Sequence, residues 1–135
     1  MVAYSGARNE LLVVECKSYL DSFGVRAREL DGLPASGKSR YKLFVEPDPL
    51  RRVILNRLVS QLAERGFCRP DVTVQLALAC GKIHGKDGVA ELHALAERDG
   101  WRLIEPSWLV DRLTRAAEAS YENEIASVTA KLLLR

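Results

Sequence analysis

The 135-residue sequence has few of the features that define several common protein classes. It holds three cysteines, Cys16, Cys68 and Cys80, an odd number without the spacing of metal ligands. A disulfide-rich secreted scaffold is therefore not expected, and we expect reduced thiols in a cytoplasmic protein. No segment is long and apolar enough for a transmembrane helix, so we expect no membrane partner. The opening residues, MVAYSGARNE, lack the basic and apolar regions of a signal peptide.

The sequence also lacks a large excess of positive or negative charge, and it lacks several common catalytic motifs. The chain has 20 Lys and Arg against 18 Asp and Glu, and this net charge of +2 permits a nucleic-acid partner without arguing for one. It contains no glycine-rich phosphate loop, zinc-ligand spacing or nucleophile elbow. The composition is 47% hydrophobic and 28% charged, which is typical of a globular protein. The length suits a single domain over residues 1–135.

What is present is a regular alternation of strand-like and helix-like segments. We expect strands over Leu11–Tyr19, Tyr41–Pro47, Asp71–Ile83 and Trp101–Pro106, and helices from Asp48 to Gly66, over Val89–Arg98, and from Ser107 to the end of the chain. MVAY is expected to form a hairpin with the first strand through SGARN. Segment 71–83 is apolar on both faces, which indicates a central strand. The order predicts an α/β fold, a mixed sheet flanked by helices with a long C-terminal helix.

Helical spacing predicts which side chains face the core. The expected inner residues are Leu50, Val53, Ile54, Leu58 and Leu62 in the first helix, Val89, Leu92 and Leu95 or Ala96 in the second, and a stripe that includes Leu109 and Leu113 in the third. Trp101 and Trp108 are expected to pack the last helix against the sheet. Gln75, among apolar residues of a strand, is best explained as a hydrogen-bonded core amide.

A charged pair, Glu15 and Lys17, follows the apolar run LLVV at the end of the first long strand. Side chains alternate along a strand, so the two point to the same face. Taken alone, this pattern most often means a surface ion pair at a strand end. Glu10 is an odd number of residues from Glu15 and is expected to face the other side.

The stretch NELLVVECKSY resembles the catalytic strand of the PD-(D/E)xK nuclease superfamily, which has the restriction-endonuclease-like fold. The resemblance covers roughly Met1 to Ile83, because a helix and an apolar strand follow in the required order. It implies that Glu15 binds a divalent metal such as Mg²⁺ and that the backbone carbonyl of Cys16 completes the coordination. Lys17 would then orient water or stabilise charge on the phosphate of a DNA substrate.

The sequence departs from this family at the first metal-binding carboxylate. In the family this residue is an Asp that opens a D-x-(apolar)-A run, and the matching run here is MVAY. The Asp would fall immediately before Met1, outside the sequence, together with the usual first helix and strand. Either the chain is part of a longer nuclease, or it is naturally short and lacks the metal site. We expect weak or absent hydrolysis, and an open sheet edge that favours a homodimer.

Basic residues with two aromatic neighbours follow the motif strand and suggest a nucleic-acid contact. They are Arg26, Arg28, Lys38, Arg40 and Lys42, with Tyr41 and Phe44 among them, and a second group holds Lys82, His84 and Lys86. We expect Lys38, Arg40, Lys42 and Lys82 to contact phosphates. For the second group a solvated turn is the competing interpretation. The alternative function is a non-catalytic domain of the same fold that binds nucleic acid or another protein.

Overall fold

The structure is a computed structural model that describes residues 1–17, 23–32, 40–45 and 48–118. Its sheet has four strands in the order β1-β2-β3-β4. They are β1 (Val2–Ser5), β2 (Glu10–Lys17), β3 (Thr73–Cys80) and β4 (Arg102–Ile104). The first pair is antiparallel and the other two are parallel, so the sheet is mixed as predicted, and β3 is an inner strand. β1 lies at a sheet edge, and the homodimer expected from such an edge remains a prediction.

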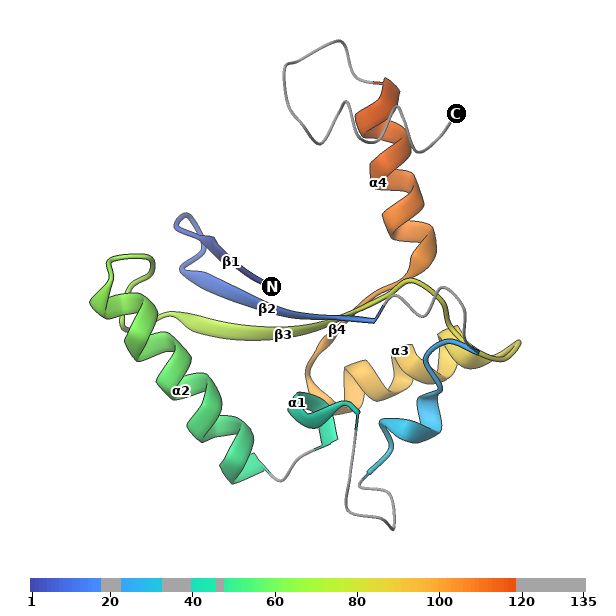
Figure 1. Ribbon diagram of the computed structural model, residues 1–135, viewed down its shortest axis with the longest axis horizontal. Helices are drawn as coiled ribbons and strands as arrows, with labels where there is room; N and C mark the ends of the chain where they lie inside the picture. The colour runs from blue at the N-terminus through green and yellow to red at the C-terminus, as the bar shows by residue number, and fades with distance from the viewer. Residues whose placement is uncertain (18–22, 33–39, 46–47, 119–135) are drawn as a thin grey trace.

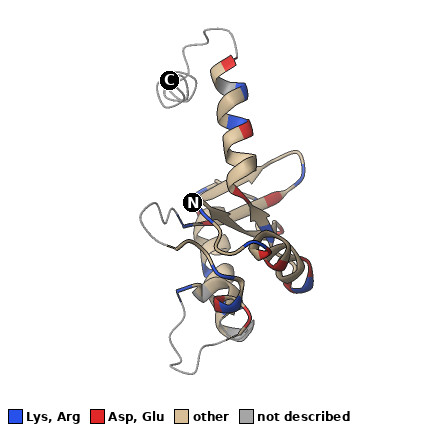
Figure 2. Ribbon diagram, turned by 90° about the vertical axis from the view of Figure 1, so that its right-hand side faces the viewer, with Lys and Arg blue, Asp and Glu red and all other residues tan. Residues whose placement is uncertain are grey.

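Helices cover mainly one face of this sheet. They are the 3-10 helix η1 (Ala27–Glu29), α1 (Lys42–Val45), α2 (Asp48–Glu64), α3 (Gly88–Asp99) and α4 (Pro106–Glu118). In Figure 1, α1, α2 and α3 lie on one side of the sheet, whereas α4 rises from β4 on the other side. Figure 2 shows the same projection of α4 from a second direction. The predicted helix is therefore present as far as Glu118, and its continuation lies outside the described residues.

The core lies between the sheet and the helices on its covered face. Leu11 and Val13 of β2 and Leu76 and Leu78 of β3 are buried, and they alternate with residues of the opposite face. Side chains from the connecting segments complete this core: Val25, Leu30, Tyr41, Phe44, Leu92, Leu95 and Trp101. In the part of the chain that is described, no helix is long and apolar enough to cross a lipid bilayer.

The strand expected over Tyr41–Pro47 is wrong. Residues 42–45 form the short helix α1, and the backbone amides of Phe44 and Val45 both donate to the Tyr41 carbonyl. Tyr41 and Phe44 are both buried, and Phe44 meets Trp101 edge to face at 5.2 Å between ring centroids. A helical turn brings residues three apart to one side, so burial of both aromatic rings overrides the strand preference of this segment.

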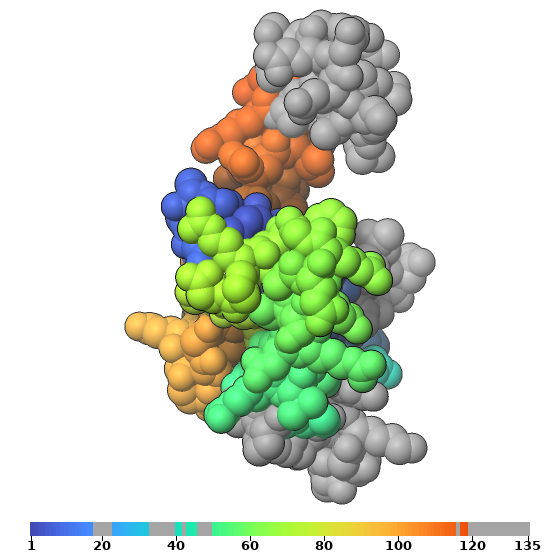
Figure 3. Space-filling model, turned by 90° about the vertical axis from the view of Figure 1, so that its left-hand side faces the viewer, coloured from blue at the N-terminus to red at the C-terminus, as the bar shows by residue number. Residues whose placement is uncertain are grey.

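The inner face expected for α2 is only partly confirmed. Leu58 and Leu62 pack against the core together with Leu55 and Val59. Leu50, Val53 and Ile54, also predicted to face inward, are instead exposed to 47%, 63% and 44%. Much of the surface seen in Figure 3 belongs to this helix. The helix carries apolar residues on two neighbouring stripes, and the sequence alone does not select the one that meets the sheet.

The predictions for the side chains of α3 and α4 are also confirmed only in part. In α3, Leu92, Leu95 and Ala96 are buried as predicted, whereas Val89 is exposed. In α4, Leu113 is 38% exposed and Trp108 is 49% exposed, because this helix projects from the body. The expectation that both tryptophans pack the last helix onto the sheet is therefore wrong. Trp101 is buried against Phe44 of α1, and Arg112 lies over the Trp108 ring.

Candidate functional site at the carboxyl ends of the central strands

Glu15 and Lys17 occupy the carboxyl end of β2 on the helix-covered face. They continue the row of Leu11 and Val13, as strand alternation predicts. The Glu15 Oε1 and Lys17 Nζ atoms lie 2.7 Å apart, and the two side chains are only 19% and 22% exposed. This burial strengthens their attraction relative to a fully solvated pair. The pair therefore sits where the packed core ends and the surface begins.

The Lys17 ammonium has three partners. Besides Glu15, its Nζ donates a hydrogen bond to the Arg40 carbonyl at 2.9 Å. It also lies 5.2 Å from the centroid of the Tyr41 ring, within the range of a cation–π interaction. Tyr41 is fully buried, so the ring is fixed by its surroundings. These contacts from two separate segments hold a cation in a defined position at the end of the strand.

The backbone of Cys16 points toward the β1 side of the sheet. The Val14 amide donates to the Met1 carbonyl at 2.8 Å, and the Met1 amino group donates to the Val14 carbonyl at 2.9 Å. Backbone groups two residues apart point the same way, so the Cys16 carbonyl also points to the β1 side. The Lys17 carbonyl points to the β3 side, where it accepts from the Gly81 amide at 2.8 Å. No strand in the described part of the chain pairs with Cys16 on the β1 side.

Other carboxylates do not join Glu15 in the described structure. Glu10 lies on the opposite face, as predicted, and its Oε2 is 3.3 Å from Arg102 Nη2. Asp21 and Glu46 lie outside the described residues. Within residues 1–17, 23–32, 40–45 and 48–118, no three His, Cys, Asp or Glu side chains are placed to bind a metal. Among the described residues, the Glu15 carboxylate and the Cys16 carbonyl are the donors that we assign to a cation here.

The hairpin register identifies the position that faces Glu15. Val2 pairs with Val13, and Met1 exchanges two hydrogen bonds with Val14. A residue preceding Met1 in the same register would lie opposite Glu15. Directly opposed residues in an antiparallel pair share a face, with Cβ atoms about 4.5–5.5 Å apart. The position across from Glu15 in this register is therefore the one immediately before Met1, and a carboxylate at that position remains a prediction.

The residues predicted to contact DNA are only partly described. Arg40 is exposed, and its carbonyl accepts the hydrogen bond from Lys17. Lys82 is exposed and follows Gly81, which is hydrogen-bonded to the Lys17 carbonyl. The structure thus brings Arg40 and Lys82 to the strand end that carries Lys17. Lys38 lies outside the described residues, as does the side chain of Lys42.

The structure brings together two basic groups that lie far apart in the sequence. Val25 and Ile83 form a parallel β-bridge, in which the Val25 amide donates to the Lys82 carbonyl and the His84 amide donates to the Val25 carbonyl, both at 2.9 Å. This contact places Arg26 beside the turn that follows β3. Gly24 has a φ of +86°, a backbone conformation that favours glycine. The sequence does not reveal which segment this glycine packs against.

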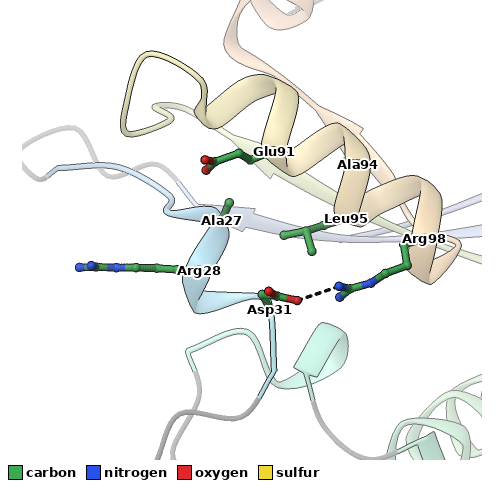
Figure 4. Close-up of a pocket in the computed structure, with 7 residues that line it drawn as sticks. All are labelled: Ala27, Arg28, Asp31, Glu91, Ala94, Leu95 and Arg98. Carbon is green, nitrogen blue, oxygen red and sulfur yellow. Dashed lines mark hydrogen bonds and ion pairs between the residues drawn. The ribbon is translucent and has the colours of Figure 1, made fainter.

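A groove runs between η1 and α3 next to this junction. Figure 4 shows its central pocket, about 410 Å³, lined by Ala27, Arg28, Asp31, Glu91, Ala94, Leu95 and Arg98. A second pocket of about 400 Å³ continues it toward His84 and Lys86, and shares Ala27, Arg28 and Glu91 with the first. At the other end Arg98 donates to Asp31 at 2.7 Å and to Asp99 at 2.8 Å. Hydrogen bonds to Asp99 and Asp31 raise the pKa of Arg98, whose guanidinium is thus committed to these carboxylates.

The three cysteines occupy different environments, and we expect different reactivities. Cys16 is exposed, whereas Cys68 and Cys80 are buried, and burial raises the pKa of the Cys80 thiol to about 12. Alkylation depends on the thiolate, so at pH 8 iodoacetamide should modify Cys16 and leave Cys80 unmodified until the protein unfolds. Peptide mass spectrometry with and without urea measures this order. Modification of Cys80 in the native protein at the rate of Cys16 would contradict its burial.

Comparisons of the chain with models of known protein families, with curated proteins and with solved structures found no match. The resemblance carried by residues 1–83 thus remains a prediction from the motif.

Proposed function

We propose that this chain is a nuclease-like domain that uses a divalent metal ion to act on DNA phosphodiesters. The observation that carries the proposal is the arrangement at the end of β2. The Glu15 carboxylate and Lys17 ammonium share one face, and the Cys16 carbonyl points to the β1 side of the sheet, where no described strand pairs with Cys16. A metal-dependent phosphodiester hydrolase needs a carboxylate ligand, a further oxygen donor and a cation close to the phosphate.

We also propose that the α/β fold of the chain is restriction-endonuclease-like. Support comes from the order of the elements, because the β1–β2 hairpin is followed by α2 and then by β3 parallel to β2. That is the order implied by the resemblance of residues 1–83. Parallel strands also gather functional residues at their carboxyl ends, where Glu15, Lys17 and Gly81 lie.

The donors at this site suit a weakly held Mg²⁺ or Mn²⁺. Mg²⁺ usually keeps several water ligands and is held by one or two carboxylates together with substrate phosphates. Glu15 and the Cys16 carbonyl can supply two oxygen donors of this kind. When bound, such an ion would polarise a phosphoryl oxygen and lower the pKa of a coordinated water. With a single carboxylate in the described site, we expect weak metal binding and slow or absent hydrolysis.

The remaining roles fall to the chain's own cationic side chains. Lys17 is positioned by Glu15, Arg40 and Tyr41, so its ammonium can stabilise charge on a phosphate or orient a water without a large rearrangement. Arg40 and Lys82 flank the same strand end and can hold the DNA backbone in register. Contacts of this kind position a substrate and carry no sequence preference.

Calorimetric titration of Mn²⁺ into three proteins tests the proposal. The unmodified chain should bind weakly, Glu15→Gln should lose binding because its amide carries no charge, and Glu10→Gln should bind like the unmodified chain. Glu10 is a matched control, since it lies on the same strand but on the opposite face. Binding that survives Glu15→Gln, or that fails equally in all three proteins, would contradict a metal site at Glu15.

A non-catalytic domain that binds nucleic acid is the second candidate. It is favoured by the presence of one carboxylate, Glu15, in the described part of the site, and by Arg26, Arg28 and Lys86, which line the groove between η1 and α3 together with acidic residues. The two functions separate in a gel assay with labelled DNA and Mn²⁺. A shifted band without cleavage products supports the binding domain, whereas cleavage that is lost in Glu15→Gln supports the nuclease.

A further inference from the structure

We propose that the junction between residues 23–28 and 82–91 binds a phosphate of a single-stranded nucleic acid and stacks an unpaired base on Phe23. This inference rests on the nucleic-acid substrate proposed above and adds a second binding site to it. The site comprises the pocket shared by Arg26, Arg28, His84 and Lys86, with Phe23 beside it.

The junction is built from two segments that are fixed against each other. Two backbone hydrogen bonds of 2.9 Å join Val25 to Lys82 and His84. A Cβ atom on Gly24 would lie 2.8 Å from the Lys82 carbonyl oxygen, so only glycine allows the two backbones to approach this closely. The side chains that follow each segment are thus held in a defined relation to one another.

Three cationic side chains line the pocket, and none of them forms an ion pair with another described residue. Arg26, Arg28 and Lys86 share its wall with Asp87 and Glu91, yet among the described residues no salt bridge joins any of these five groups. In Figure 4, Arg28 extends outward from η1 at the edge of the groove and does not reach toward α3. Guanidinium and ammonium groups that are not committed to a carboxylate are available to a phosphate.

Phe23 supplies the stacking surface next to the pocket. Its side chain is 72% exposed, although the ring is contacted from two sides. The Arg26 guanidinium carbon lies 5.2 Å from the ring centroid, and His84 meets the ring edge to face at 5.9 Å. An exposed aromatic ring beside a basic pocket is the usual arrangement for single-stranded nucleic acids, in which unpaired bases stack on side chains.

The junction lies close to the Glu15–Lys17 pair. Gly81 is hydrogen-bonded to the Lys17 carbonyl, and His84 follows three residues later, at most roughly 10 Å along an extended chain. Arg40 and Lys82 lie near the same strand end. A nucleic-acid strand with a phosphate at Lys17 could therefore place a neighbouring nucleotide at the junction.

Fluorescence anisotropy with a labelled single-stranded oligonucleotide in EDTA tests the site without any metal. Phe23→Leu should weaken binding roughly 5- to 150-fold, the range seen when one base loses its aromatic partner. Phe67→Leu should have no effect, because Phe67, although 63% exposed, does not line the groove. Lys86→Ala should reduce the slope of log K against log salt concentration by about 0.7, the value for one lost phosphate contact on a single strand. Arg69→Ala, an exposed arginine outside the groove, should leave the slope unchanged.

Other outcomes would overturn the inference. Equal losses in Phe23→Leu and Phe67→Leu would show that binding is not centred on the junction. Tighter binding to a duplex of the same sequence, unaffected by Phe23→Leu, would exclude base stacking. Circular dichroism and thermal melting of each variant check that the fold is retained, and all substituted side chains are exposed.

The two proposals fail in different ways. If oligonucleotide binding in EDTA depends on Phe23 but Mn²⁺ does not bind at Glu15, the nuclease proposal is contradicted and the proposed binding site at the junction is supported. If Mn²⁺ binds at Glu15 but oligonucleotide binding does not change when Phe23 or Lys86 is substituted, the proposed binding site at the junction is contradicted and the metal site is supported.

Discussion

Gly24→Ala is expected to lower the free energy of unfolding by about 3 kcal/mol. The φ angle of +86° costs an L residue about 1–2 kcal/mol. The new Cβ would also lie 2.8 Å from the Lys82 carbonyl oxygen and 2.9 Å from its carbonyl carbon. Both are backbone atoms that cannot move independently, and relief of such a clash typically costs a further 1–3 kcal/mol or so. Urea denaturation followed by tryptophan fluorescence measures the loss.

Gly66→Ala is the matched control for this prediction. Gly66 has a similar φ of +73°, but no atom beyond its chain neighbours lies within 4 Å of the position that a Cβ would take. It should therefore lose only the conformational part, about 1–2 kcal/mol. If both substitutions cost the same, the close approach of Gly24 to Lys82 does not contribute to stability, and the junction is less tightly held than the hydrogen bonds indicate.

An aspartate placed immediately before Met1 is expected to tighten Mn²⁺ binding by about tenfold or more, because affinity rises with the number of charged ligands. A chain with Met-Asp added before Met1 supplies this residue. In the register of the hairpin, its carboxylate would lie on the same face as Glu15 and directly across from it. The Met1 nitrogen, now a peptide N–H, can still donate to the Val14 carbonyl. Calorimetry measures the affinity, and nicking of supercoiled plasmid measures any gain in cleavage.

A one-residue shift provides the control for this gain. With Met-Asp-Ala added before Met1, the aspartate moves one position along the strand and its side chain turns to the opposite face. Charge and length are nearly the same, but the carboxylate no longer meets Glu15. We expect the affinity of this variant to equal that of the unmodified chain. Equal gains from both extensions would indicate a general charge effect and not a built site.

The sequence predicted strands well where periodicity and burial agree. Segment 71–83 is apolar on both faces and forms the inner strand β3, as predicted, and the strand predicted over Leu11–Tyr19 is present as β2. The Gln75 amide donates to the Leu76 and Gly100 carbonyls, so it is hydrogen-bonded as predicted, but it is half-buried and does not belong to the core. The strand predictions succeeded because a buried strand needs apolar side chains on both faces whatever packs against it.

Predictions that required knowledge of tertiary contacts were less successful. Tyr41 and Phe44 are compatible with a strand as well as with a helix. The segment forms the helix α1 because this conformation buries both rings in the core. Which stripe of α2 faces inward depends on how the helix is rotated against the sheet, and Val53 is therefore exposed. At the candidate site, the Glu15–Lys17 pair followed from alternation. The contacts of Lys17 with Arg40 and Tyr41 did not, because they cross between segments.

The order of the strands in the sheet has a consequence for the folding reaction. Because neighbouring strands are consecutive in the chain, the β1–β2 hairpin and the β3–α3–β4 unit can each form from local contacts. Only the pairing of β2 with β3 must close a long loop, since residues 18–72 separate the two strands. Loop closure of this length slows folding, so formation of the β2–β3 ladder is expected to limit the overall rate. Substitutions that weaken this ladder, such as Val13→Ala or Leu76→Ala, would then mainly slow folding, whereas substitutions in α4 would mainly accelerate unfolding.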